Sequence, residues 1–250
     1  MTQPLVLCVM PAAGRQSMVN RAVCCFRAQT YSNKLLAILD NGPEPLVIEA
    51  GRGVHVTRLQ PGVDRRPIGE LRNLVNALAL PGVFDAPIIA HWDSDDVSSA
   101  ERLTEQVALL QQSGAEAVGY GEMLFWDSRP GAFCGAWLFT SPNPRYCLGT
   151  SLCYWRKTWE RKPFEATSQG EDFAFCAGLK TVSVTSIFDV HNDTFVECLP
   201  IGDAEKTPRM IATIHSGNTS VAYRTELMRQ AEEWQRVPEW DDYARKVMEC

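Results

Sequence analysis

Hydrophobic and polar residues alternate along the first 115 residues in blocks of two lengths. Short apolar runs bounded by turn residues are typical of buried strands, and longer runs with apolar residues three or four positions apart are typical of helices. The blocks predict strands at residues 5–10, 35–39, 54–59 and 88–92, and helices at 17–29, 68–78 and about 98–112. This alternation predicts an α/β fold with a doubly wound, mostly parallel sheet.

Beyond Gly114 the pattern is less regular. It predicts strands at 117–120, 122–126 and 182–187, strand-like pieces at 195–198 and 210–215, a short helix at 170–179, and a polar helix over 222–246 that is broken near Pro238. Residues 127–147 collect glycine, proline and aromatic residues, which predicts either a wall over a ligand site or an ordinary packed loop. No internal repeat or long linker interrupts the chain, so we expect a single domain over residues 1–250.

The composition is typical of a soluble globular protein, with 45% hydrophobic and 22% charged residues. The net charge of −6 argues against broad binding to nucleic acid, because no basic stripe offsets the phosphate charge. No apolar run reaches the ~18 residues that span a bilayer, and residues 1–9 lack the basic start of a signal peptide. We therefore expect no transmembrane segment.

The chain has nine cysteines, which are scattered through apolar segments and form no C-x-x-C pair. This usage favours reduced thiols in the core over a zinc site or a redox dithiol. We expect a cytoplasmic protein, with peripheral attachment to a membrane left open.

An acidic loop follows the fourth expected strand. Asp93, Asp95 and Asp96 place three carboxylates within four residues, and such charge needs a cation, a helix N-terminus or several hydrogen-bond donors nearby. Ser98 and Glu101 predict a capping box at the start of the next helix. Ligands of α/β proteins bind beyond the carboxyl ends of strands, and carboxylates suit Mg²⁺ or Mn²⁺. The loop is therefore a candidate metal site, and a solvated acidic turn is the alternative.

Several short motifs, in order along the chain, resemble the landmarks of the family 2 glycosyltransferases, which have the GT-A fold. They are Pro11 to Arg15 after the first strand, Ala28-Gln29-Thr30-Tyr31, Asp40-Asn41-Gly42, Gly69 with Arg72 and Asn73, Asp93-Ser94-Asp95, Glu171-Asp172, and His215 to Ser220. Each motif alone is weak, but their ordered combination is specific.

The resemblance implies a role for each motif. Asp172 would be the general base. Asp95 would bind the metal, Asp93 would bind it or hold the ribose, and His215 would be either a third metal ligand or a buried structural histidine. The expected nucleotide-sugar contacts are Pro11, Arg15, Asp40, Gly69, Arg72, Asp93, Ser94 and Glu171.

The resemblance also implies the reaction. A hexosyltransferase of this kind would use Mn²⁺ or Mg²⁺ to move a sugar, with inversion, from a UDP-, GDP- or dTDP-sugar to a hydroxyl of a glycan or glycoconjugate. No Q-x-x-R-W motif follows Asp172, which favours a non-processive enzyme. Residues about 1–115 would bind the nucleotide sugar, about 116–220 the acceptor, and about 221–250 would form a helical tail.

The motifs depart from the family pattern at two places. Ala13-Gly14 replaces the usual Tyr-Asn before Arg15, and Asn41 replaces the second aspartate after Asp40. Because both places would face the nucleotide, its base stays unassigned.

Two other functions fit parts of the pattern. Asp93 to Val97 also matches the D-x-D-x-[TV] loop of haloacid-dehalogenase-like phosphatases, in which Asp93 would be the nucleophile. That loop normally follows the first strand of its domain, whereas three strands are expected before it here. A non-catalytic carbohydrate-binding module is the third alternative, and it would not need Asp172.

Overall fold

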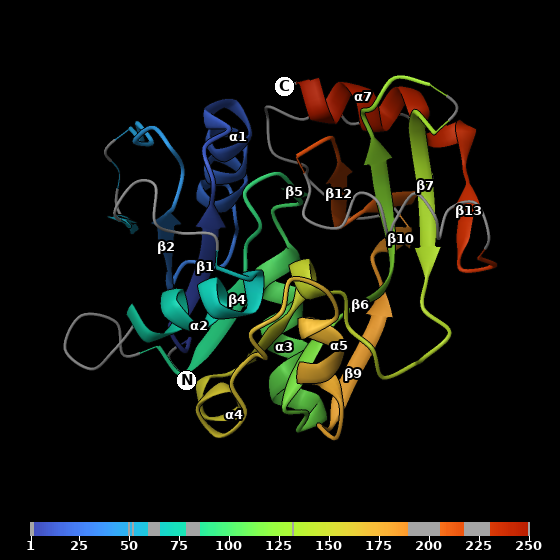
Figure 1. Cartoon of the computed structure of the whole chain (residues 1–250). Helices are drawn as coiled ribbons and strands as arrows, with labels where there is room; N and C mark the ends of the chain where they lie inside the picture. The colour runs from blue at the N-terminus through green and yellow to red at the C-terminus, as the bar shows by residue number, and fades with distance from the viewer. Residues whose placement is uncertain are drawn as a thin grey trace.

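The alternating blocks of the first half form four parallel strands and their connecting helices. In this computed structural model, which describes residues 3–49, 51, 53–59, 66–78, 86–131, 133–189, 206–217 and 231–249, the strands lie side by side in the order β3-β2-β1-β4 (Figure 1). Their bounds are β1 Val6–Ala12, β2 Lys34–Asp40, β3 Val54–Arg58 and β4 Ile88–His91, and the helices are α1 Gln16–Arg27, α2 Ile68–Leu78 and α3 Arg102–Ser113. These elements lie where the apolar pattern predicts them.

The second half extends the same sheet with strands of both directions. Next to β4 come β8, β6, β7 and β13, while β9 and β12 pair in parallel with β6. The strand bounds are β5 Val97–Ser98, β6 Ala117–Asp127, β7 Gly135–Thr140, β8 Cys153–Trp155, β9 Thr181–Thr185, β10 Ile187–Asp189, β11 Lys206–Pro208, β12 Met210–Ile214 and β13 Trp234–Arg236. The helical segments are η1 Gly149–Ser151, α4 Arg156–Arg161, α5 Glu171–Cys176, η2 Pro238–Trp240 and α7 Asp241–Glu249.

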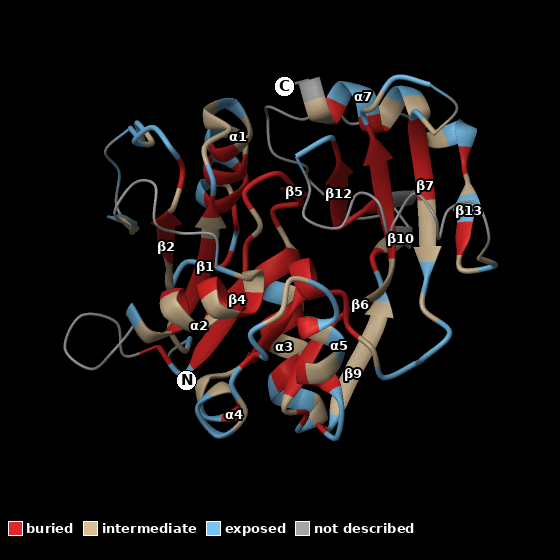
Figure 2. Ribbon diagram, in the orientation of Figure 1, coloured by how far each residue is buried: buried red, intermediate tan, exposed pale blue. Residues whose placement is uncertain are grey.

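Helices cover both faces of this sheet, as the doubly wound prediction requires. One buried cluster joins the strands to α1, α3 and α7, and a second, on the other side of β1, joins them to α2 and α5. Alternate residues of β1 explain the division, since Val6, Cys8 and Met10 enter the first cluster and Leu7 and Val9 the second. Figure 2 shows the central strands buried along most of their length.

Three local predictions are wrong. Ser98 lies in β5 and accepts a hydrogen bond from Arg102, and the residue at the start of α3, Glu101, makes no side-chain cap, so the capping box does not form. The two strands expected at 117–126 are one strand, β6, with a register shift between Tyr120 and Glu122. Within 222–246, residues 234–236 form β13 because they pair with β7. The strand expected at 195–198 lies outside the described residues.

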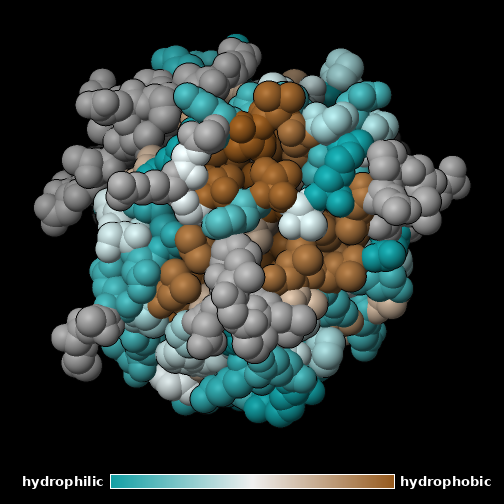
Figure 3. All heavy atoms as spheres, turned by 90° about the vertical axis from the view of Figure 1, so that its left-hand side faces the viewer, coloured by the Kyte–Doolittle hydropathy of each residue, from teal (hydrophilic) through white to brown (hydrophobic). Residues whose placement is uncertain are grey.

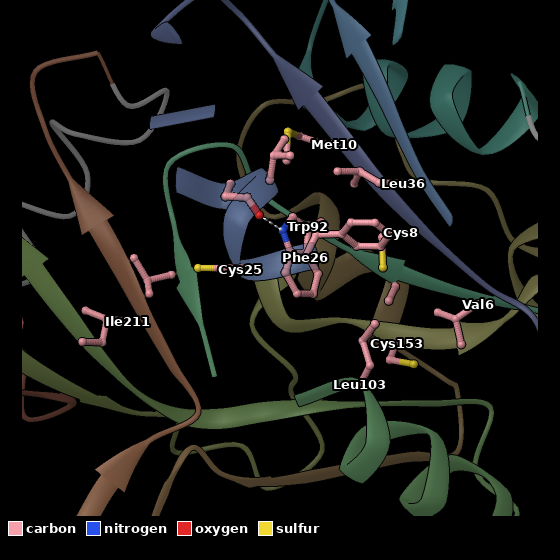
Figure 4. Close-up of a cluster of buried hydrophobic side chains, with 14 of the residues drawn as sticks. Val6, Cys8, Met10, Cys25, Phe26, Leu36, Trp92, Leu103, Cys153 and Ile211 are labelled. Carbon is pink, nitrogen blue, oxygen red and sulfur yellow. Dashed lines mark hydrogen bonds between the residues drawn. The ribbon is translucent and has the colours of Figure 1, made fainter. Parts of the chain in front are cut away.

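The last residue of the central apolar run, Trp92, fixes the end of β4 under α1 (Figure 4). Its indole N–H donates to the carbonyl of Ala22 at 2.9 Å, and its ring meets the ring of Phe26 edge-on at 6.0 Å. On another side the guanidinium of Arg102 lies 4.8 Å from the ring centroid. Because Trp92 immediately precedes Asp93, this packing sets where the acidic loop begins.

Strand β3 forms the edge of the sheet that lies farthest from the second half of the chain. Figure 3 shows hydrophobic side chains gathered on the side of the molecule where β2 and β3 lie, and the exposed large hydrophobic residues include Val47 and Val56.

Within the described part of the chain, no helix has the length and apolar composition needed to cross a membrane.

Replacing the buried indole should destabilise the fold strongly. We expect Trp92→Ala to lower the free energy of unfolding by about 3–5 kcal/mol, because it leaves a large cavity in the core. Phe173→Ala is the control, since the Phe173 side chain is 56% exposed and should cost no more than about 0.5 kcal/mol. Urea unfolding measures both. Equal losses in the two variants would contradict this role for Trp92.

Candidate active site

A cavity of about 1020 Å³ opens beyond the carboxyl ends of β1, β2 and β4 and reaches across to the second half of the sheet. The expected site residues that line it come from four places in the sequence: Pro11 and Arg15, Arg72, Asp93 to Asp95, and Glu171 with Asp172. The fold therefore brings together the motifs that the sequence keeps apart. Asp40 and Gly69 are absent from the cavity lining, and His215 adjoins it through Asp95.

Asp95 lies at the centre of a cluster with two nitrogen donors. Its Oδ2 atom is 3.1 Å from Nη1 of Arg15 and 3.0 Å from Nε2 of His215. Burial alone would raise the pKa of Asp95, but the hydrogen bond from His215 and the charge of Arg15 outweigh burial and lower it. Asp95 is therefore held as a carboxylate facing the cavity.

Both ring nitrogens of His215 have partners. The backbone N–H of Gly217 donates to Nδ1 at 2.9 Å, so in the neutral ring Nε2 carries the proton and donates to Asp95. Nε2 also lies 2.8 Å from Nη1 of Arg15, which crowds two N–H groups around one oxygen. Binding of a cation at Nε2 requires the other tautomer and the loss of the Gly217 hydrogen bond.

Arg15 reaches this cluster from an unusual backbone conformation. It has φ 61° and ψ 52° and immediately precedes α1, in a region that costs non-glycine residues energy. From there its Nη2 also donates to Ser94 at 3.3 Å. The side chain thus binds both Ser94 and Asp95, and these contacts hold the strained turn in place.

Asp93 faces a different cation. Its Oδ2 lies 3.5 Å from Nη2 of Arg72, and Oε1 of Glu171 lies 3.6 Å from the same nitrogen. Burial alone would lower the pKa of Arg72, but Asp93, Glu171 and Asp172 outweigh it and raise the pKa. Burial raises the pKa of Glu171 despite the nearby guanidinium. Arg72 therefore joins the acidic loop to the Glu-Asp motif.

Asp96 is buried and connects the acidic loop to the second half of the chain. Its Oδ2 accepts a hydrogen bond from the hydroxyl of Thr150, and its Oδ1 accepts one from the N–H of Thr213 at 2.9 Å. Burial raises the pKa of Asp96 to about 7, and Asp95 and Asp93 add to the rise. These contacts indicate a structural role for the third carboxylate.

Asp172 is half-buried at the start of α5 and is held by three donors. Oδ2 accepts from the Tyr146 hydroxyl at 2.7 Å and from the Gly149 N–H at 2.8 Å, while Oδ1 accepts from the Phe173 N–H at 2.8 Å. A Cβ atom at Gly149 would lie 2.7 Å from Oδ2 of Asp172 and 3.0 Å from Nη1 of Arg72. Position 149 therefore needs glycine if both side chains are to keep these places.

Asp40 and Gly69 make mainly structural contacts here. Asp40 is 1% exposed and accepts hydrogen bonds from the N–H groups of Gly42 and Leu46 and from Arg58. These contacts fit a turn-forming residue, and its role towards a nucleobase stays a prediction. Gly69 lets the backbone pass close to residue 165, because a Cβ there would lie 1.8 Å from a carbonyl oxygen.

No motif identifies the residues that hold these side chains in place. Tyr146 lies in the aromatic segment 127–147, which the sequence predicts as either a wall over a ligand site or a packed loop, and it does line the cavity. Gly149 and Thr150 follow that segment, and Thr213 lies in an apolar strand. Arg102, which the sequence predicts only as part of a helix, is buried and donates to the carbonyls of His91 and Thr150. The sequence does not assign these contacts, because they join distant segments.

A resident cation would need ligands beyond the described side chains. No group of three or more His, Cys, Asp or Glu side chains that would hold a metal ion occurs in the described ranges. Asp95 and His215 form a pair, whereas Asp93 turns towards Arg72. The pair suits Mn²⁺ or Mg²⁺ only if phosphate or water oxygens complete the coordination.

Solved structures of other proteins share this architecture, although no protein-family model and no curated protein sequence matches the chain. Among solved structures, the chain is similar to S. aureus TarS 1–349 in complex with UDP-GlcNAc, with a TM-score of 0.57 and 12% identity over 85% of this chain and 59% of that one. The same TarS fragment in complex with UDP gives 0.56 and 12%, over 98% and 69%.

A second similar protein is the mannosyltransferase PcManGT from Pyrobaculum calidifontis, in complex with GDP-Man and Mn²⁺. Its TM-score is 0.54 with 10% identity, over 99% of this chain and 70% of that one. This chain thus spans about three fifths of the TarS fragment bound to UDP-GlcNAc and about 70% of the mannosyltransferase. At such identities the likeness establishes the fold, and the chain has the GT-A glycosyltransferase fold that its motifs predict.

The hydroxyl of Thr150 should stabilise the acidic loop measurably. We expect Thr150→Val to lower the free energy of unfolding by about 1–3 kcal/mol, because the buried Asp96 loses a donor while the volume is kept. Thr140→Val is the matched control, since the Thr140 hydroxyl contacts Glu122 at an exposed position and should matter by about 0.5 kcal/mol at most. If urea unfolding finds the two variants alike, Asp96 does not depend on Thr150.

Proposed function

We propose that the chain is an inverting, metal-dependent glycosyltransferase of the family 2 type. The observation that carries this proposal is that one cavity holds both the Asp95 cluster and Asp172, while Arg72, which contacts Asp93 and the carbonyl of Gly149, lies between them. A transferase needs this division, since the leaving group and the attacking hydroxyl lie on opposite sides of the transferred sugar. The GT-A fold supports the same assignment.

The donor is a nucleotide sugar whose diphosphate lies near the acidic loop. Arg15 and Arg72 line the cavity and contact carboxylates of this loop, and a guanidinium can bind phosphate with two parallel hydrogen bonds. Pro11, Ser94 and Asn41 line the same part of the cavity. TarS and the mannosyltransferase were solved with UDP-GlcNAc and GDP-Man respectively, which supports a donor of this class.

Asp95 is the proposed metal ligand, and His215 joins it in the tautomer that frees Nε2. When bound, Mn²⁺ or Mg²⁺ would offset the negative charge that develops on the diphosphate leaving group. Arg15 now donates to the Asp95 oxygen that the metal would take, so its guanidinium would be released towards the phosphates. Asp93, which faces Arg72, is left to hold the ribose.

Asp172 is the proposed general base. It would accept the proton of an acceptor hydroxyl as that oxygen attacks the anomeric carbon from the side opposite the diphosphate, which inverts the configuration. Tyr146 and the Gly149 N–H fix one carboxylate oxygen. Its other oxygen accepts from the Phe173 N–H and keeps a free lone pair for the acceptor proton.

Neither alternative function gains support from these contacts. A phosphatase would present Asp93 as an unhindered nucleophile, but Asp93 is paired with Arg72. A binding module would have no use for a carboxylate held as Asp172 is held.

The metal assignment can be tested by calorimetry with UDP and GDP. We expect wild-type protein to bind one of these nucleotides at least about tenfold more tightly with Mn²⁺ than without, and Asp95→Asn to lose this difference. His215→Gln should reduce the difference only in part. Asp93→Asn is the control and should keep it. Mn²⁺-dependent affinity that persists in Asp95→Asn would refute the assignment.

The base assignment separates catalysis from binding. Asp172→Asn keeps the size of the side chain but cannot accept a proton at neutral pH, so transfer should fall ~10²–10⁴-fold. The affinity for the nucleoside diphosphate should stay within about threefold, because Asp172 contacts the acceptor. Release of nucleoside diphosphate, measured with and without acceptor, follows both. Full turnover by Asp172→Asn would exclude it as the base.

A further inference from the structure

Aromatic rings line the part of the cavity that the proposed donor does not use. Phe125 from β6, Phe139 from β7 and Trp234 from β13 all border it. The Phe125 and Phe139 ring centroids lie 4.8 and 5.0 Å from that of Trp234, and 6.3 Å from each other. We call these three residues the aromatic wall.

The aromatic wall lies on a sheet face that carries no helix among the described residues. Its rings belong to a buried cluster formed by β6, β7, β12, β13 and neighbouring loops. On the opposite face of these strands, α7 supplies Ala244 and Val247 to the first cluster, and Figure 1 shows α7 crossing that end of the sheet. The wall is thus an apolar surface turned towards the cavity.

A second pair of rings stands beside the proposed base. Tyr146, whose hydroxyl binds Asp172, lies 5.9 Å from the ring of Phe173, and both line the cavity. Among the aromatic residues that the structure describes, Phe173 is the most exposed, at 56%. If a molecule places its hydroxyl at Asp172, the part of the molecule next to that hydroxyl would therefore contact the rings of Tyr146 and Phe173.

The charged residues that line the cavity also differ between the first and second halves of the chain. Its described cationic lining residues, Arg15, Arg66 and Arg72, all come from the first half of the chain. The described charged residues that the second half of the chain from Glu171 onward adds to the lining, Glu171, Asp172 and Glu233, are all acids. Among the described residues the cation beside these acids is Arg72, which is already paired with Asp93 and Glu171, so an anionic acceptor would meet carboxylates that this cation only partly offsets, which is unfavourable in a partly desolvated site.

We propose that the acceptor is an uncharged hydroxy compound with an apolar ring or chain next to its reactive hydroxyl, and that this apolar portion binds against the aromatic wall and Phe173. The inference rests on the glycosyl transfer proposed above and specifies its acceptor. The cavity volume of about 1020 Å³ lies at the top of the ~300–1,000 Å³ range of ligand pockets. Apolar contact and ring stacking would supply the affinity, and Glu233 would repel anions.

The test compares three probes that share a glucose unit: phenyl β-glucopyranoside, methyl β-glucopyranoside and glucose 6-phosphate. Calorimetry measures their binding to the full chain, with and without saturating UDP or GDP and Mn²⁺. We expect the phenyl probe to bind roughly tenfold more tightly than the methyl probe. With nucleotide and Mn²⁺ occupying the proposed donor site, glucose 6-phosphate should bind no more tightly than the methyl probe.

Two variants connect the preference to the rings. Phe139→Ala and Phe173→Ala should each reduce the phenyl-over-methyl preference at least about threefold and leave nucleotide affinity unchanged. Phe133→Ala is the matched control, because Phe133 packs on Trp137 and does not line the cavity. Because Phe173 is exposed, its variant gives an answer even if Phe139→Ala fails to fold.

The outcomes distinguish this inference from the proposed function. Equal binding of the phenyl and methyl probes, tighter binding of glucose 6-phosphate than of the methyl probe when nucleotide is present, or a preference that survives both variants would overturn the inference. The affinity for UDP or GDP in the presence of Mn²⁺ is measured in the same experiment. If the protein binds neither nucleotide, the proposed glycosyltransferase function is contradicted; if it binds one of them, that function stands whatever the probes show.

Discussion

Three carboxylates at the end of one buried strand impose the constraint on which the site depends. Asp93, Asp95 and Asp96 lie too close together to be buried without opposite charges or donors. The fold solves this by giving each a different partner: Arg72 for Asp93, the Arg15–His215 pair for Asp95, and two threonines for Asp96. Each partner comes from another part of the chain, so satisfying the acidic loop assembles the site.

The same contacts join the two halves of the molecule. Thr150 and Thr213 tie Asp96 to the second half, and Arg72 donates to the carbonyl of Gly149, whose N–H holds Asp172. The proposed nucleotide and acceptor parts of the cavity thus share a short chain of hydrogen bonds. We infer that the position of the base depends on the charge balance around the acidic loop, which a metal and a diphosphate would change.

The sequence predicts the first half well because its strands and helices carry periodic apolar patterns. The apolar runs of β1, β2, β3 and β4 can be recognised as strands without knowing which strands they pair with. Pattern alone failed where pairing decided the structure: Trp234 to Arg236 read as part of a helix but form a strand against β7, and Ser98 read as a cap but lies in β5. Local patterns contain no information on such contacts.

The candidate site was predictable to the extent that motifs mark it. The motifs named Asp95, Arg72 and Asp172, and the structure brings all three to one cavity. They did not indicate Tyr146 or Thr150, whose roles arise from a single hydroxyl meeting a carboxylate across the fold. Nor did they reveal that Asp40 is enclosed by its own turn, because enclosure depends on Arg58 from the next strand.

Donor cleavage is the most direct test of the proposed activity. The protein would be incubated with α-linked UDP-, GDP- and dTDP-sugars, Mn²⁺ and phenyl or methyl β-glucopyranoside, and the products examined by chromatography and NMR. For one of the nucleotides we expect release of nucleoside diphosphate together with an equal amount of sugar product. That product should be a β-linked glycoside, or a free sugar formed in the β configuration where water replaces the acceptor. No cleavage of any donor, together with hydrolysis of a simple phosphate ester, would contradict a glycosyltransferase and favour the phosphatase alternative.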